Sequence, residues 1–146
     1  MTLENLESIG RLKSHSADRV EIQRLLAAAE VSLKDAQRKE VSASSRFELA
    51  YKSLMQSALT ALLANGYRPS TSEPGHHQTI LQTLPKTIGL MPERLKLFDV
   101  LRRARNAADY EGVPVEDSKL DACIEAARHL HAEVRAWLKA NRPELG

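Results

Sequence analysis

The eleven residues RRARNAADYEG, 102–112, hold the side chains of this chain that best suit the binding of an anion. Three arginines, an asparagine, an aspartate and a tyrosine fall within about three helical turns. Residues four apart are neighbours on a helix, which places Arg105 beside Asp109. A second polar row lies next to this pair and consists of Arg102, Asn106 and Tyr110. Because a guanidinium can donate two hydrogen bonds at once, this pattern suits phosphate.

Arg105 is the arginine whose position most needs an explanation. It falls on the same helical stripe as Leu101, so its side chain begins on the inward or groove-facing side. A guanidinium cannot lose its proton there, and without a carboxylate partner its burial costs several kcal/mol. Asp109 is the obvious partner. Two interpretations follow: a structural ion pair with Tyr110 packed at the helix end, or a basic groove formed by Arg102, Arg103 and Arg105.

The charged segment ends one of five helices that the apolar periodicity predicts. Apolar residues recur at intervals of three and four, which predicts helices over residues 17–38, 43–65, 75–84, 92–110 and 117–140. Asp18 with Glu21, and Ser45 with Glu48, have the spacing of capping boxes at the start of the first two helices, although earlier serines compete with Ser45 for the start of the second. Gly66 ends the second helix, because glycine tolerates the left-handed conformation found there.

The fold class follows from the kind of periodicity. No segment shows the alternation of a strand, and Ala and Leu supply most of the apolar mass. The sequence therefore predicts an all-α fold, an up-and-down antiparallel four-helix bundle with a short additional helix. Residues 17–141 would form this bundle, with 1–16 as a loose or short helical lead-in and 142–146 as a tail. Residues 67–75, YRPSTSEPG, are predicted to be a loop of turn formers.

Composition limits the possible partners. The 146 residues carry a net charge of +2, so any argument for nucleic acid must be local. The single cysteine, Cys123, excludes an intrachain disulfide and suits a reducing compartment. The chain shows no secretory signal and no window of ~20 apolar residues. We therefore expect a cytoplasmic protein that does not span a membrane.

The adjacent histidines His76 and His77 raise the question of a metal site. Neighbouring residues on a helix point about 100° apart and rarely share one metal, so we expect no metal and no cofactor. They are interpreted as a solvated or capping pair, with a second possibility that either histidine reaches the Arg105 region across the bundle. Four further residues are interpreted as core or packing residues: Tyr51, Cys123, His131 and Trp137.

These segments together are similar to a known family. RNAADYEG resembles the signature region of HEPN domains, in a branch that carries an Arg-x-x-x-Asp-Tyr pattern. Residues 45–69 resemble the second helix of that family, and GHHQTI, 75–80, resembles its short histidine-led third helix. The similarity covers most of residues 17–141.

The resemblance implies a helical bundle that forms a homodimer through the face bearing the motif. Many such domains occur beside a minimal nucleotidyltransferase in bacterial toxin–antitoxin pairs. Active members are metal-independent endoribonucleases that use an arginine, a polar residue and a histidine. The arginine and the polar residue correspond to Arg105 and Asn106, whereas Tyr110 occupies the histidine position. Because tyrosine has a pKa near ~10, it transfers protons poorly at neutral pH.

Three functions remain open at this point. The favoured one is a non-catalytic HEPN-like dimer that binds a nucleotide, RNA or a partner protein. Its ligand-binding residues would be Arg102, Arg105, Asn106, Asp109 and Tyr110. The second is an endoribonuclease with Arg105 and Tyr110 as candidate catalytic residues. The third is a purely structural bundle in which Arg105 and Asp109 form an internal ion pair.

Overall fold

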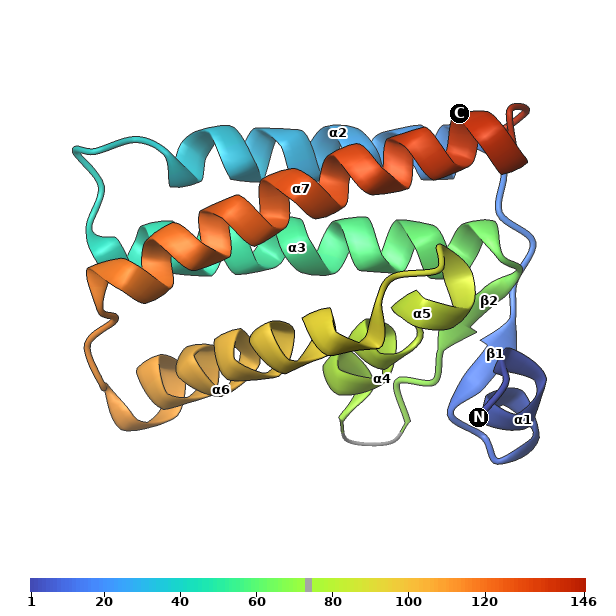
Figure 1. Cartoon of the computed structure of the whole chain (residues 1–146), viewed down its shortest axis with the longest axis horizontal. Helices are drawn as coiled ribbons and strands as arrows, with labels where there is room; N and C mark the ends of the chain where they lie inside the picture. Colours follow the sequence, from blue (N-terminus) through green and yellow to red (C-terminus); the bar gives the residue numbers. More distant parts are fainter. Residues whose placement is uncertain (73–74) are drawn as a thin grey trace.

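Helices dominate the computed structural model, which describes residues 1–72 and 75–146. This confirms the all-α class. Four long helices correspond to four of the five predicted ones: α2 (Arg19–Ala36), α3 (Ala43–Ala64), α6 (Leu95–Glu111) and α7 (Asp117–Asn141). The chain reverses direction from each of these helices to the next, and α3 lies between α2 and α6 (Figure 1). No helix in the described ranges is long and apolar enough to cross a membrane.

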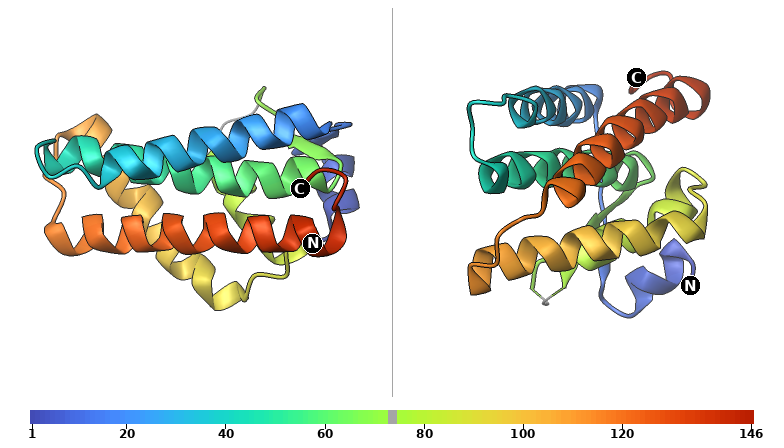
Figure 2. Two further views of the ribbon diagram at one scale, coloured as in Figure 1. Left: turned by 90° about the horizontal axis from the view of Figure 1, so that it is seen from above. Right: turned by 60° about the vertical axis from the view of Figure 1, so that its left-hand side comes forward.

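The centre of the core is α3, which contacts α2, α6 and α7. Views from two further directions show α2, α3 and α7 packed together (Figure 2). Ala50, Ala58 and Ala61 of α3 are fully buried, and such small side chains let neighbouring helices approach closely. Ser53 also donates a 2.7 Å hydrogen bond to the Ala29 carbonyl of α2. Because α3 is packed closely in the core, the side chains on its remaining face start from a fixed backbone.

Three of the residues interpreted as structural have the expected environments. Cys123 is fully buried, and burial raises the pKa of its thiol to about 12, so it is a small core residue. His131 is partly buried, and its Nε2 lies 3.1 Å from the Leu26 carbonyl oxygen. Trp137 is partly buried against the core. These three predictions are confirmed.

The short helix predicted over 75–84 is two helices, α4 (His76–Gln82) and α5 (Leu84–Thr87). Pro85 lies in the first turn of α5, where its missing N–H needs no partner. The predicted inward residues Ile80, Leu81 and Leu84 are buried. Because α4 contacts both α3 and α6, its first residues lie beside the charged end of α6.

The predicted absence of strands is wrong. Residues 1–16 contain α1 (Leu3–Ser8) and β1 (Leu12–Ser14), and β1 pairs antiparallel with β2 (Tyr67–Pro69). Strands of three residues are too short to show a period of two, and their partners are far apart in the sequence. Part of the loop predicted over 67–75 is thus a strand, while its residues Glu73 and Pro74 lie outside the described residues.

Neither predicted capping box is complete. Asp18 accepts a 2.8 Å hydrogen bond from the Glu21 N–H at the start of α2, as predicted, but the Glu21 carboxylate pairs with His15 and not with the Asp18 N–H. At α3, however, the cap is Ser42, whose hydroxyl accepts from the Ser45 N–H at 3.3 Å. The helix begins earlier than the predicted box because Ser42 is extended and already satisfies that donor. Glu48 therefore does not cap α3.

The beginning and end of α6 have distinct causes. The 3₁₀ helix η1 (Pro92–Arg94) leads into α6, and proline suits such a first turn. Gly112 ends α6 in the left-handed conformation, with φ 65°. Only Phe98 and Leu101 of α6 are fully buried. Most of α6 is therefore close to solvent, and the side of the helix nearest α3 and α4 carries Arg105.

Candidate functional site at the junction of α3, α4 and α6

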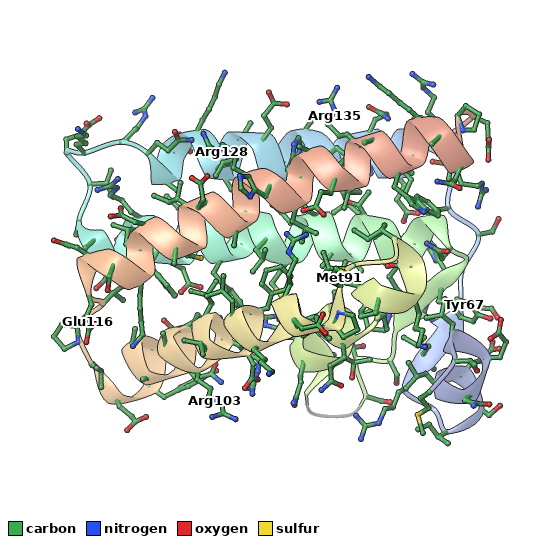
Figure 3. The ribbon with its side chains drawn as sticks, in the orientation of Figure 1. Tyr67, Met91, Arg103, Glu116, Arg128 and Arg135 are labelled. Carbon is green, nitrogen blue, oxygen red and sulfur yellow. The ribbon has the colours of Figure 1, made fainter. Side chains whose placement is uncertain are left out.

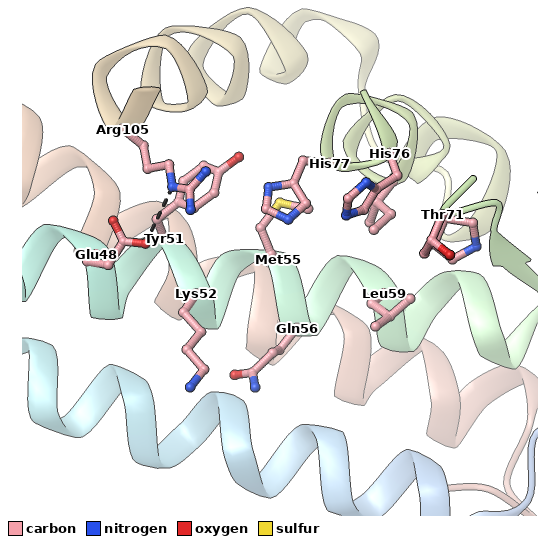
Figure 4. A pocket seen from close by; sticks show the side chains of 12 residues that line it. Glu48, Tyr51, Lys52, Met55, Gln56, Leu59, Thr71, His76, His77 and Arg105 are labelled. Carbon is pink, nitrogen blue, oxygen red and sulfur yellow. Dashed lines mark hydrogen bonds and ion pairs between the residues drawn. The ribbon is translucent and has the colours of Figure 1, made fainter. Parts of the chain in front are cut away.

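Two clefts open where α3, α4 and α6 meet. The apolar cleft has a volume of about 420 Å³, and its apolar lining comes chiefly from Tyr51, Met55, Leu59, Pro69 and Ile80 (Figure 4). The polar cleft has a volume of about 400 Å³, and its side-chain lining includes Gln78, Arg102, Asn106 and Tyr110. His76, His77 and Arg105 line both clefts. The two clefts therefore adjoin, and these three residues stand where they meet.

Arg105 makes the predicted ion pair and one that was not predicted. Its Nε lies 3.0 Å from Asp109 Oδ2 and 3.4 Å from Glu48 Oε1 of α3. The guanidinium carbon lies 5.8 Å from the centre of the Tyr51 ring, within reach of a cation–π interaction. Both ion pairs use Nε, and neither terminal nitrogen donates a hydrogen bond within the described part of the chain. The four N–H groups of the two terminal nitrogens therefore have no acceptor among the described residues.

The immediate surroundings of Arg105 are not basic, because one guanidinium faces two carboxylates. Partial burial lowers the pKa of Arg105, but Glu48 and Asp109 outweigh this effect and the pKa is raised. The side chain is 21% exposed, so the charged guanidinium is reachable but largely enclosed. An anion at the terminal nitrogens of Arg105 would leave both ion pairs in place, but it would approach two nearby carboxylates that repel it.

The other two arginines of the segment are paired with Asp99. Arg102 donates to Asp99 Oδ1 from Nε at 3.2 Å and from a terminal nitrogen at 2.8 Å, and Arg103 Nε lies 3.0 Å from Asp99 Oδ2. The Arg103 side chain is 75% exposed and projects from α6 away from α3 (Figure 3). Arg103 lines neither cleft, so the predicted groove of three arginines is wrong for this residue.

Tyr51 is buried beneath Arg105 with an unsatisfied hydroxyl. Only 2% of the residue is exposed, which confirms its interpretation as a core residue. Its hydroxyl oxygen is buried and has no hydrogen-bond partner among the described residues, while the residue as a whole lines the apolar cleft. Burial raises the pKa of Tyr51 to about 12, against the opposing charges of Arg105 and Arg102. The hydroxyl therefore keeps its proton and is a donor in need of an acceptor.

The geometry confirms that His76 and His77 reach the Arg105 region. The ring of His77 lies 6.2 Å from that of Tyr51 and 4.8 Å from that of His76, measured between centroids. Burial lowers the pKa of His77, and the nearby His76 and Arg105 lower it further. Within the ranges that the structure describes, no three metal-ligating side chains cluster.

Four of the five predicted ligand-binding residues line the polar cleft, namely Arg102, Arg105, Asn106 and Tyr110. Asp109 lies outside the lining and acts on it through its ion pair with Arg105. Tyr110 is 78% exposed, so it is not packed at the helix end as the structural interpretation supposed.

Sequence reasoning missed the pairing of Glu48 with Arg105 and the unpartnered hydroxyl of Tyr51 beside the apolar cleft. Glu48 was assigned to a capping box, and Tyr51 was assigned to the core because it follows the inward stripe of α3. One signal was available for Tyr51: a tyrosine on an inward stripe carries a hydroxyl that needs a partner. No local pattern pointed to the pairing of Glu48 with Arg105, because these residues come from different helices.

Comparison of the chain with protein-family models, curated proteins and solved structures finds no match. The fold and the clefts together define a helical protein with an apolar pocket beside a partly satisfied guanidinium. The function is therefore argued from this geometry.

Proposed function

We propose that this protein binds a nucleotide at the junction of α3, α4 and α6 without transforming it. The observation that carries this proposal is a set of unused donors beside an apolar cleft, namely the Arg105 terminal nitrogens and the Tyr51 hydroxyl. A volume of about 420 Å³ lies in the range of small-molecule sites. The apolar cleft would take the base, and Arg105 would take the phosphate.

The charge pattern favours one phosphate over the backbone of a long RNA. Binding along a strand depends on several cations that neutralise successive phosphates. Here Arg102 and Arg103 already share Asp99, and Arg105 is accompanied by two carboxylates. Lys52 lines the apolar cleft, but its ammonium points toward α2 and away from Arg105 (Figure 4). The groove that the two adjoining clefts form thus offers one anion site, at Arg105.

A non-catalytic role also agrees with the resemblance to the HEPN family, which we retain as part of the proposal. The resemblance rests on the motif of Arg105, Asn106, Asp109 and Tyr110, with tyrosine where active members have histidine. A bundle of HEPN type, a homodimer, a nucleotidyltransferase partner and a cytoplasmic location are proposals on the same ground. The exposed apolar residues Leu97 and Val100 of α6 support a contact between two copies.

Calorimetric titration with the four ribonucleoside 5′-monophosphates tests the proposal. We expect Arg105→Ala to weaken binding at least about tenfold, because a hydrogen bond to a charged group contributes about 1.5–3 kcal/mol. Arg103→Ala is the matched control: it removes an arginine from the same helix outside both clefts, and we expect unchanged affinity. Equal binding by Arg105→Ala and the unaltered protein would contradict the proposal. If none of the four nucleotides binds, the purely structural bundle is the interpretation that remains.

One observation favours the endoribonuclease as a second candidate. His77 lies in the same groove as Arg105, so an imidazole rather than Tyr110 is placed to transfer a proton. Incubation with RNA in EDTA across pH ~6 to ~9 distinguishes the two functions. Cleavage that disappears in His77→Gln would replace the binding proposal with this one.

A further inference from the structure

His77 would add a positive charge beside Arg105 if its imidazole were protonated. The two other cations that line the clefts are engaged or turned away, because Arg102 is paired with Asp99 and Lys52 points toward α2 (Figure 4). His77 lines both clefts, as Arg105 does, and points from α4 toward α3 beside Met55 (Figure 4). The charged and titratable groups around it are Glu48, Tyr51 and Lys52 of α3, His76 of α4, and Arg102, Arg105 and Tyr110 of α6. The Glu48 carboxylate is directed at Arg105 (Figure 4), and the charges that act on His77 are those of His76 and Arg105.

This environment makes the charge of His77 depend on what fills the groove. Without an anion, burial, His76 and Arg105 all oppose protonation of the imidazole. A phosphate bound at the free nitrogens of Arg105 would lie in the adjoining clefts and reverse the sign of the local field. Arg105 is already matched by Glu48 and Asp109, so two added negative charges require a cation besides Arg105.

We propose that His77 is a further ligand-binding residue, which becomes protonated with the ligand and selects a terminal phosphate monoester over a phosphodiester. This inference rests on the proposed nucleotide site and deepens it. A monoester carries close to two negative charges at pH 7, because its second pKa is about 6. A diester carries one charge and has little need of the imidazolium. Internal RNA phosphates are diesters, so the groove would bind free nucleotides or 5′-phosphate ends.

The protonation of His77 on binding fixes the direction in which the nucleotide affinity changes with pH. If the ligand raises the pKa of His77, binding takes up protons, and affinity rises as pH falls through the pKa of His77 in the complex. One linked proton changes the affinity by at most about tenfold per pH unit. Below pH ~6 the phosphate itself becomes protonated and the trend ends. The informative window therefore lies between pH ~6.5 and ~8.5.

Calorimetry of the full chain with adenosine 5′-monophosphate and with its phosphate methyl ester tests this inference. We expect the affinity for the monoester to rise at least about fivefold from pH ~8.5 to ~6.5. The methyl ester should bind at least about tenfold more weakly, with no trend over the same range. In His77→Gln the trend should disappear, while His129→Gln, at an exposed histidine of α7, should retain it.

A second measurement needs no variant. At pH ~7, titration in two buffers of different ionisation enthalpy gives the protons taken up per nucleotide bound, and we expect a clear fraction of one proton. Zero uptake, or equal affinity for monoester and methyl ester, overturns the role of His77 while nucleotide binding itself stands. An identical pH trend in His77→Gln also overturns it. Failure of every nucleotide to bind overturns the proposed function, and this inference with it.

Discussion

At each end of α6 an arginine lies over an aromatic ring, but the two arginines pair with carboxylates in different ways. Near its beginning, Arg94 lies over Phe98, with its guanidinium carbon 6.0 Å from the ring centre. Toward its end, Arg105 lies over Tyr51 at 5.8 Å. Arg94 donates from both terminal nitrogens to the two oxygens of Glu133 on α7, at 2.6 and 2.7 Å. Arg105 meets its two carboxylates only through Nε.

The difference indicates which arginine is structural. A guanidinium that faces a carboxylate with two parallel hydrogen bonds has its strongest geometry and little capacity for another anion. Arg94 therefore joins α6 to α7. Among the described residues, the terminal nitrogens of Arg105 and the hydroxyl of the ring below it have no hydrogen-bond partner, and Phe98 has no such hydroxyl. We infer from this incomplete pairing that Arg105 belongs to the proposed binding site.

The largest effect on this comparison should come from Phe98→Ala. Phe98 is fully buried and is one of two such residues on α6, so its truncation leaves a cavity at the structural end. We expect a loss of about 3–4 kcal/mol in the free energy of unfolding, measured by urea denaturation. Tyr110→Ala is the control at the other end: because Tyr110 is 78% exposed, the change should stay within about 0.5 kcal/mol. Comparable losses in both variants would remove the distinction between the two ends.

Arg94→Ala should have a smaller effect on stability and none on binding. Both members of the Arg94–Glu133 pair are about one-third exposed, so we expect a loss of about 1 kcal/mol, the upper end for such pairs. Nucleotide affinity should not change, which is the opposite of the result expected for Arg105→Ala. Parallel urea and calorimetric titrations of the two variants check this. A fall in affinity for Arg94→Ala as large as for Arg105→Ala would show that the arginines act alike.

The sequence predicted what depends on neighbours within one helix. The four long helices follow from apolar periodicity, and the Arg105–Asp109 pair follows from residues four apart. The pairing of Arg105 with Glu48 could not be predicted, since it depends on α3 beginning at Ser42 and on how α3 packs against α6.

Contacts between distant segments were equally inaccessible. The bidentate pair of Arg94 with Glu133, and the pairing of β1 with β2, join parts of the chain that have no local signal in common. The proximity of His77 to Arg105 was only one of two interpretations, because α4 had to be placed between α3 and α6 before it could be decided.

Tyr51→Phe should have the smallest effect on stability, yet it distinguishes a ligand-binding role of Tyr51 from a purely structural one. Removal of one oxygen deletes a buried hydroxyl that lacks a partner, so the free energy of unfolding should stay constant or rise by up to about 1 kcal/mol. Nucleotide binding should weaken about twofold to tenfold, because a neutral hydrogen bond contributes about 0.5–1.5 kcal/mol.

Tyr67→Phe makes the same change on β2, outside both clefts, and should leave binding unaltered. Urea denaturation and calorimetry of the two variants provide the measurements. If Tyr51→Phe instead loses stability and keeps full affinity, its hydroxyl contributes to folding, and the α3 side of the groove has no part in recognition. If Tyr51→Phe gains stability and loses affinity, the hydroxyl contacts the ligand. A hydroxyl that only filled the core could not change the affinity in this way.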